Sequence, residues 1–303
     1  MIRLAARVLS CALLLLAAAA LASSQRLEPP NPTLTPPALN PLVVEGDAHY
    51  TRRDEGRAGG RADSRQILAA IGAYETAAEA PDNSEARWKL ARALYFRGEY
   101  TGLDAAARRA VFEKARQVSE EAIGILARRA GHPKGFGDEP AAKVAEAVRN
   151  DSDAAPTFFW AAVSWGQWSL SVGKLAAARL GAASRIRDAA AVVIALDPTF
   201  EEGGGHRILG RLHDQAPKLP VLTWWVSRKE ALANLRRAVE IAPHNLVNLH
   251  FLAEALAHGG TAERAEAIEI EEQVVAAAPS PNHLVEEIHI QEEAKRNLGT
   301  WRR

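Results

Sequence analysis

The stretch SRKEALANLRRAVEIAPHNLVNLHFLAEAL, residues 227–256, decides the fold. It consists of two segments whose apolar residues recur at helical spacing, and Pro243 separates them. Proline cannot continue a helix interior, so the chain must turn there. The small residues that precede Pro243 let two helices approach each other closely. The stretch therefore predicts a helical hairpin.

The same ending occurs three more times, as YETAAEAP, AVVIALDP and VVAAAP, so that Pro81, Pro198, Pro243 and Pro279 mark a repeat. Pro243 and Pro279 are 36 positions apart, close to the ~34-residue period of tetratricopeptide repeats. Pro198 and Pro243 are 45 apart, which indicates an insertion at APKLPVLTWW. No alternating apolar pattern predicts a strand. We expect an all-α, tetratricopeptide-like solenoid of about four degenerate repeats over residues 63–298, with a C-terminal capping helix.

The N-terminus has the three parts of a secretory signal peptide over residues 1–22. Arg3 and Arg7 precede an apolar run, and Ala20-Leu21-Ala22 forms a small-x-small cleavage site. A retained membrane anchor is the alternative, although the run is short for a span of ~20 residues. Residues 23–62 are rich in proline, then in glycine and charge, and predict a flexible linker. We expect an exported or periplasmic protein without a transmembrane segment in its mature form.

Composition excludes several classes of function. The chain has 37 basic and 37 acidic residues, so no broad basic surface is available for nucleic acid. Its single cysteine, Cys11, lies in the expected signal peptide and precedes the apolar run, whereas a lipoprotein signal would place it after. There is no G-x-S-x-G or H-E-x-x-H motif, and His283 and His289 are read as exposed helix polarity. We expect no catalytic residue, metal or cofactor.

The tryptophan-rich stretch FFWAAVSWGQW, residues 158–168, predicts a helix buried on two sides. One stripe includes Trp165 and Trp168, which we interpret as buried packing residues. A second stripe contains Phe159, Val163, Gly166 and Leu170. Trp160 lies on the remaining side, where it either contacts a ligand or partner or packs under a loop.

A polar cluster follows the triple glycine Gly203-Gly204-Gly205, which we interpret as a flexible turn, with anion binding at a helix start as the alternative. Arg207 and Arg211 share one helical face, and His206 and His213 share a neighbouring face. Adjacent arginines repel unless carboxylates or a bound anion neutralise them. Glu201 and Glu202 are the candidates for internal neutralisation. If they do not pair with the arginines, the cluster is a candidate binding site.

Trp224 and Trp225 form a tandem pair on the proline-flanked insertion. Such a pair either packs as a lid or recognises a partner.

Three stretches together carry a family resemblance: FFWAAVSWGQW, DPTFEEGGGHRILGRLHDQAPKLP (residues 197–220) and the hairpin of residues 227–256. They resemble the TatT-type components of tripartite ATP-independent periplasmic (TRAP) transporters, over roughly residues 63–279. The resemblance implies degenerate tetratricopeptide-like hairpins, export, and work with the transporter's substrate-binding protein. It also implies that a small ligand, a hydrophobic one included, is held or handed over through a central cleft or pore. Many members are lipoproteins, whereas this chain has no convincing lipobox.

These patterns favour a non-enzymatic scaffold that binds a protein partner, such as a periplasmic solute-binding protein, and a small ligand. The candidate contact residues are Trp160, His206, Arg207, Arg211, His213, Trp224 and Trp225. Two alternatives remain: an adaptor for another envelope complex, and a hydrolase or lyase that uses Glu/His pairs. The identity of the partner and a homo-oligomeric state remain open.

Overall fold

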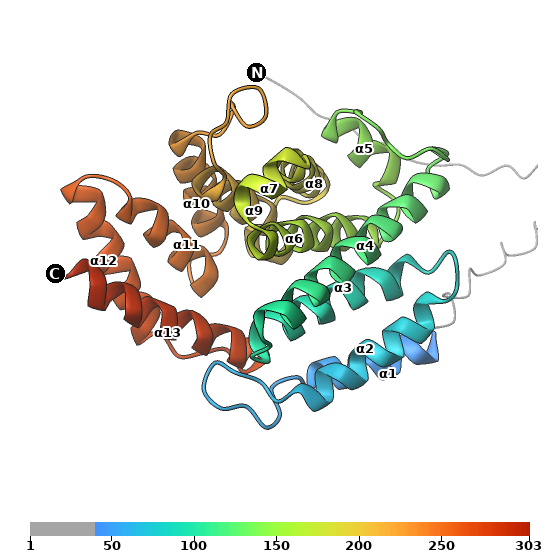
Figure 1. Cartoon of the computed structure of the whole chain (residues 1–303), viewed down its shortest axis with the longest axis horizontal. Helices are drawn as coiled ribbons and strands as arrows, with labels where there is room; N and C mark the ends of the chain where they lie inside the picture. The colour runs from blue at the N-terminus through green and yellow to red at the C-terminus, as the bar shows by residue number, and fades with distance from the viewer. Residues whose placement is uncertain (1–39) are drawn as a thin grey trace, which may run out of the picture. The chain divides into compact units, whose positions relative to one another are not determined.

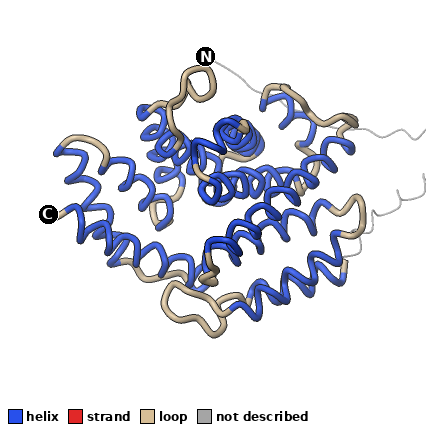
Figure 2. Tube along the Cα trace, in the orientation of Figure 1, coloured by secondary structure: helices blue, strands red, loops and turns tan. Residues whose placement is uncertain are grey.

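The computed structural model describes residues 40–303, and the predicted signal peptide and residues 23–39 of the predicted linker lie outside them. The described residues form one compact unit. Within it every regular element is helical, apart from an isolated bridge between Ala58 and Arg61 (Figures 1 and 2). The helices are α1 (Pro41–Thr51), α2 (Ser64–Ala78), α3 (Ser84–Tyr100), α4 (Ala105–Arg129), α5 (Ala141–Val148), α6 (Ala154–Val172), α7 (Lys174–Arg179), α8 (Ala182–Leu196), α9 (Phe200–Gln215), α10 (Arg228–Ile241), α11 (Leu246–Ala257), α12 (Thr261–Ala276), the 3₁₀ turn η1 (Pro281–His283) and α13 (Leu284–Trp301).

Most of these helices pack against their neighbours in sequence, as α1–α2, α3–α4, α9–α10 and α11–α12 do. The all-α, helical-hairpin prediction is therefore confirmed for the described residues. Each marker proline follows the last residue of a helix by two or three positions, after α2, α8, α10 and α12. Side chains next to the helix starts also help to determine where helices begin, because they accept hydrogen bonds from the first backbone N–H groups. These N-cap residues are Asp63, Asn83, Asp104 and Asn245, for α2, α3, α4 and α11.

The prediction of a flexible linker is wrong for residues 40–62. Pro41 occupies the first turn of α1, where its missing N–H costs no hydrogen bond, and the Asn40 side chain caps the helix. Val43 is buried, and the Tyr74 hydroxyl donates to Asp47 at 2.6 Å. The high proline content of this segment predicted an extended chain. A proline in the first turn of a helix, however, does not disrupt the helix. The folded unit thus begins before residue 63.

The helices follow a curved path that brings the C-terminal helix back to the N-terminal ones. Figure 1 shows α13 beside α3, and the two helices are in contact. Val285 of α13 packs in the same hydrophobic cluster as Val43 of α1 and Tyr74 of α2. The Arg53 Nη2, just after α1, lies 2.8 Å from the Glu286 Oε1 of α13. This closure lets helices from both ends of the sequence enclose a common space.

Helix α6 lies at the centre of the largest hydrophobic cluster, in contact with α3, α4, α8 and α9. Trp165 and Trp168 are buried and meet edge to face, with ring centroids 5.3 Å apart. The Arg116 guanidinium lies over both rings, at 4.8 and 5.2 Å from their centroids. The interpretation of this pair as packing residues agrees with their burial.

Candidate ligand-binding cavity

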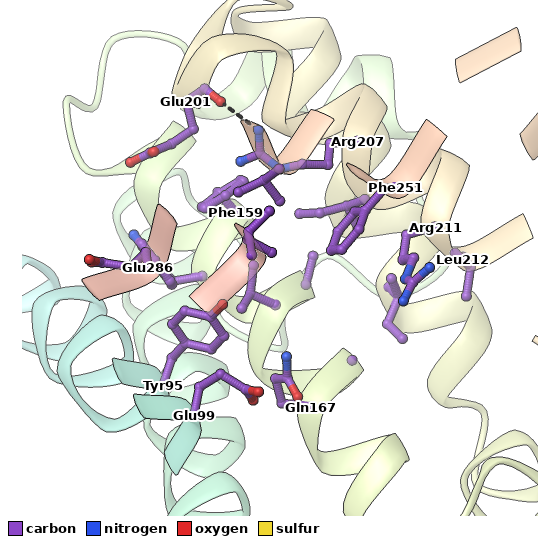
Figure 3. A pocket seen from close by; sticks show the side chains of 18 of the residues that line it. Tyr95, Glu99, Phe159, Gln167, Glu201, Arg207, Arg211, Leu212, Phe251 and Glu286 are labelled. Carbon is purple, nitrogen blue, oxygen red and sulfur yellow. Dashed lines mark hydrogen bonds between the residues drawn. The ribbon is translucent and has the colours of Figure 1, made fainter. Parts of the chain in front are cut away.

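A cavity of about 1180 Å³ lies between the helices of the curved array. Its wall combines α3 and α6 with α7, α8, α9, α11 and α13, together with residues at the end of α1. Figure 3 shows how side chains from these helices converge on it. A volume of this size is ample for a ligand of several tens of atoms. The cavity is a concave site to which helices from both ends of the described chain contribute.

One part of the cavity wall is apolar and made of small side chains. Helix α6 contributes the second stripe predicted from sequence, including Phe159, Val163 and Gly166. That stripe therefore faces the cavity instead of packing wholly against another helix. Leu170, at the end of the stripe, is 55% exposed, which places this wall next to the molecular surface. The remaining apolar contacts come from α7, α8 and α9, through Ala177, Ala178, Ala182, Ala183, Ile186, Ile208 and Leu212.

Another part of the wall is aromatic and ionic. The Tyr95 and Tyr100 hydroxyls lie 3.2 Å apart, and burial raises the pKa of both phenols well above the ordinary value. The Tyr100 ring meets His289 edge to face at 5.4 Å. Glu286 accepts a hydrogen bond from Arg53 through one carboxylate oxygen, while its buried Oε2 has no hydrogen-bond partner among the described residues. The cavity is therefore amphipathic along its wall.

Arg207 is a cavity-lining cation that no carboxylate of the described residues contacts. Its Nη1 donates to the Glu201 carbonyl at 3.1 Å and to the Asn248 Oδ1 at 2.9 Å, both uncharged acceptors. Within residues 40–303 no carboxylate lies within 4 Å of it, so neither Glu201 nor Glu202 pairs with it as one alternative required. Burial lowers its pKa, and the more distant Glu201 charge offsets this only in part. Its guanidinium is 5.9 Å from the Phe159 ring centroid (Figure 3).

The segment before Arg207 is not the flexible turn that the triple glycine predicted. Glu201, Glu202 and Gly203 adopt left-handed backbone angles within α9, with φ of 49°, 57° and 82°. The fully buried Asn248 side chain holds this turn by donating to the Glu202 and Ala238 carbonyls at 2.9 and 3.0 Å. Left-handed non-glycine residues are strained and persist where surrounding contacts enforce them. The strained turn supports the guanidinium of Arg207.

The glycines themselves are required by close packing. A Cβ at Gly204 would lie 2.5 Å from the Phe159 ring, and one at Gly205 would lie 2.7 Å from Ile194. Helix α9 can therefore approach α6 and α8 only because these positions lack side chains. This packing explains the glycines better than flexibility or anion binding does.

Arg211 also lines the cavity but is neutralised. Its Nη1 lies 2.5 Å from the Glu254 Oε2 and 3.6 Å from the Asp214 Oδ2. Its guanidinium lies 4.3 Å from the Phe251 ring centroid, and Figure 3 shows Phe251 between the two arginines. Arg207 and Arg211 thus share one face as predicted, with different electrostatic environments.

The two histidines of the predicted cluster lie outside the cavity. His206 pairs with the Asn234 Oδ1 at 3.0 Å between α9 and α10. His213 accepts a hydrogen bond from the Ser227 N–H at 3.2 Å, and burial lowers its pKa. Both contacts connect α9 to α10 or its N-cap, so the structure separates these residues from the two arginines.

The three predicted contact tryptophans differ in environment. Trp160 is buried and lines the cavity, with its ring 5.6 Å from that of Tyr95. Trp225 is half-buried, edge to face with His213 and 4.9 Å from the Arg187 guanidinium. Trp224 is 67% exposed. The tandem pair therefore divides into one packed and one solvent-facing ring.

Sequence patterns missed a buried ionic cluster beside the cavity. The His250 Nδ1 of α11 lies 3.0 Å from the Oε1 of Glu271 in α12, and its Nε2 lies 3.6 Å from Glu293 in α13. His289 lies 3.8 Å from Glu293, which lines the cavity. One signal was available: His250 and Glu271 interrupt the apolar faces of otherwise regular helices.

Comparison with known proteins identifies no family for this chain. No protein-family model matches the chain, and no curated protein matches it. Among solved structures, it is similar to the TPR2AB-domain:pHSP90-complex of yeast Sti1, at 16% identity and a TM-score of 0.30. That match covers 87% of this chain and 98% of the other. The hairpin assignment depends on the helix contacts described above, and the contents of that complex do not identify partners of this chain.

Proposed function

We propose that this protein is an exported, non-enzymatic helical scaffold that binds an elongated amphipathic anion in its central cavity. The observation that supports this most is Arg207, a cation that faces the cavity with no carboxylate partner among residues 40–303. An unpaired charge out of bulk water costs several kcal/mol, and a ligand anion would offset that cost. The apolar wall of α6, α7 and α8 is suited to the rest of such a ligand.

We further propose that the protein acts as a TatT-type accessory that presents this ligand to a periplasmic solute-binding protein. The support comes from the sequence resemblance and from the signal-peptide pattern of residues 1–22. A protein-binding role is also consistent with a helical-hairpin array, since such arrays expose long, fixed surfaces.

The ionisable groups support binding more than catalysis. A general base works best with a pKa near the working pH. The hydrogen bond from His250 is the main cause that lowers the pKa of Glu293, the carboxylate that lies between the two imidazoles of the cluster. Glu293 is therefore a weak base, and the alternative of a hydrolase or lyase gains no candidate from this pair.

The cavity proposal is tested with 11-(dansylamino)undecanoic acid and its methyl ester, which differ only in the anionic group. The wild-type protein should bind the acid more tightly than the ester, as followed by dansyl fluorescence. Arg207→Gln should weaken binding of the acid about tenfold and leave the ester unchanged, because a charge-assisted hydrogen bond contributes ~1.5–3 kcal/mol.

Arg207→Lys retains the charge and should restore most of the preference for the acid. Arg237→Gln is the matched surface control, since Arg237 is exposed and pairs only with Glu240 among the described residues. Equal affinity of the wild-type protein for acid and ester would refute the anionic part of the proposal. The partner claim is tested separately, by cross-linking in the native envelope and identification of a solute-binding protein by mass spectrometry.

A further inference from the structure

Exposed apolar side chains are concentrated in two segments of the described chain. Eight large hydrophobic residues in residues 40–303 are exposed, and six of them lie on α7, beside it, or in the loop between α9 and α10. These six are Leu170, Leu175, Leu180, Val221, Leu222 and Trp224, with exposed fractions between 43% and 87%. We call residues 170–187 and 216–229 the α7–loop face.

The two segments belong to one side of the molecule. The Lys174 Nζ, at the start of α7, donates to the Gln215 Oε1 at 2.6 Å, directly before the loop. From the other side, Arg187 of α8 lies over the Trp225 ring. Residues from both segments, including Ala177 and Pro217, line the cavity wall. The exposed residues therefore form a common surface next to the apolar part of the cavity.

This face also carries unpaired positive charge. Residues 154–187 contain four basic residues and no carboxylate, and residues 215–229 contain three basic residues and no carboxylate. Arg187 pairs with Asp188 and Arg228 pairs with Glu263, at 2.8 Å in both cases. Asp214 is buried against His258, and Glu230 borders the face. Four other cations of the face have no carboxylate within 4 Å in the described chain: Lys174, Arg179, Lys218 and Lys229. Arg185 has none either, but its guanidinium lies 5.9 Å from the Trp165 ring centroid and is not counted in this face.

The loop presents its apolar residues through a fixed conformation. The Thr223 side chain is buried, and its Oγ1 accepts from the Leu219 N–H at 2.8 Å and donates to the Pro217 carbonyl at 2.5 Å. Val221 has φ of 68°, a left-handed angle that is unfavourable for a β-branched residue. The hydrogen bonds of Thr223 hold the loop in this conformation. Val221 and Trp224 therefore remain exposed to solvent, although burial of their side chains would be favourable. Strain of this kind concentrates at functional surfaces.

From this combination we propose that the α7–loop face docks peripherally on an anionic lipid membrane. Leucine and tryptophan side chains enter the interfacial region of a bilayer, while lysine and arginine bind the anionic headgroups. None of the helices in residues 40–303 is long and apolar enough to span a membrane, so this contact is at the surface. The unpaired cations distinguish a lipid surface from an uncharged protein groove.

Docking in this orientation would place the apolar cavity wall next to the bilayer. Leu170 and Lys174 are both exposed and both line the cavity, so the wall reaches this face. An amphipathic ligand could then pass between the membrane and the cavity without crossing bulk water. This last step rests on the proposed ligand-binding function, whereas docking itself does not.

The test uses the full chain and vesicles of phosphatidylcholine with roughly 40% phosphatidylglycerol, whose acyl chains are brominated to quench nearby tryptophan. Wild-type fluorescence should contain a quenched component that Trp224→Phe removes and Trp225→Phe retains. The neighbouring half-buried Trp225 is the matched control. Any contact made by residues 1–22 is the same in all three proteins and does not remove this difference.

A second arm measures flotation with the same lipids. Leu175→Glu combined with Leu180→Glu should reduce the bound fraction about tenfold, and ~1 M salt should reduce wild-type binding because it shortens the screening length to ~3 Å. Leu68→Glu, an exposed leucine on α2, should have no effect. Quenching that persists in Trp224→Phe, or self-association without vesicle contact, would overturn membrane docking. Binding of the dansyl acid is measured without vesicles, so failure of one proposal leaves the other testable.

Discussion

The His250 Nδ1 of α11 lies 3.0 Å from the Oε1 of Glu271 in α12, and both side chains are almost fully buried. Burial disfavours the imidazolium, but hydrogen bonds to Glu271 and Glu293 outweigh it and raise the pKa of His250 to about 9. Asn297 of α13 donates to the same Glu271 oxygen at 2.9 Å. The cluster therefore ties the last three helices together around one protonated ring.

We expect the stability of the protein to fall as the pH rises through about 9 because of His250. Its folded pKa lies above the unfolded value of 6.5, so the stabilisation is complete below pH 6.5 and is lost above pH 9. The difference corresponds to about 3 kcal/mol. Urea unfolding between pH 6 and 10 measures this loss. In the double variant His250→Gln with Glu271→Gln, which keeps polar groups without the charges, this part of the pH dependence should disappear. An unchanged profile would mean that His250 is neutral in the folded protein.

Replacement of a buried tryptophan and of an exposed one should have clearly different effects on the free energy of unfolding. Trp165→Ala removes a buried ring and its contacts with Trp168 and Arg116, and should cost ~3–5 kcal/mol of unfolding free energy. Trp224→Ala removes a ring that is 67% exposed and should change stability by less than ~0.5 kcal/mol. Urea titration of both variants provides the comparison. A large loss in Trp224→Ala would assign that residue to packing of the loop.

Local features of this fold were predictable from the sequence because short-range chemistry determines them. The proline after each marked helix and the apolar stripe with Trp165 and Trp168 involve residues within a few turns of one another. Helix α1 escaped prediction because Pro41 has opposite effects at a helix start and in a helix interior. The glycines before His206 were ambiguous for a similar reason, since a glycine run can indicate flexibility or close packing.

The family resemblance implied a central cleft, but residue patterns alone could not predict which side chains line it, because the cavity depends on closure of the chain. Arg53 and Glu286 meet although they are 233 positions apart, and no periodicity encodes that distance. The pairing of Arg211 with Glu254, and the absence of such a partner for Arg207, also depend on which side of α9 faces α11. The sequence identified both arginines, whereas only the tertiary arrangement distinguishes their environments.

Asn248 should be more important for stability and binding than its small size indicates. It is fully buried, donates to two carbonyls and accepts from Arg207. Asn248→Ala leaves these groups unsatisfied and should cost ~2–4 kcal/mol. Because the same amide holds Arg207, the variant should also bind the dansyl acid more weakly. Asn234→Ala, which removes only a half-buried contact with His206 and a bond to the Glu230 carbonyl, is the control and should lose much less.

Two glycine-to-alanine variants should have opposite effects on stability. In Gly204→Ala the new Cβ would lie 2.5 Å from the Phe159 ring, so α9 must move away from α6, at a cost of ~1–3 kcal/mol. Gly72 lies inside α2 with no atom within 4 Å of its added Cβ, and Gly72→Ala should stabilise the protein by ~0.5–1 kcal/mol through helix propensity. Thermal unfolding measures both. Since Phe159 also lines the cavity, Gly204→Ala should weaken binding of the dansyl acid, while Gly72→Ala leaves it intact. A neutral Gly204→Ala would show that α9 and α6 pack less closely than described.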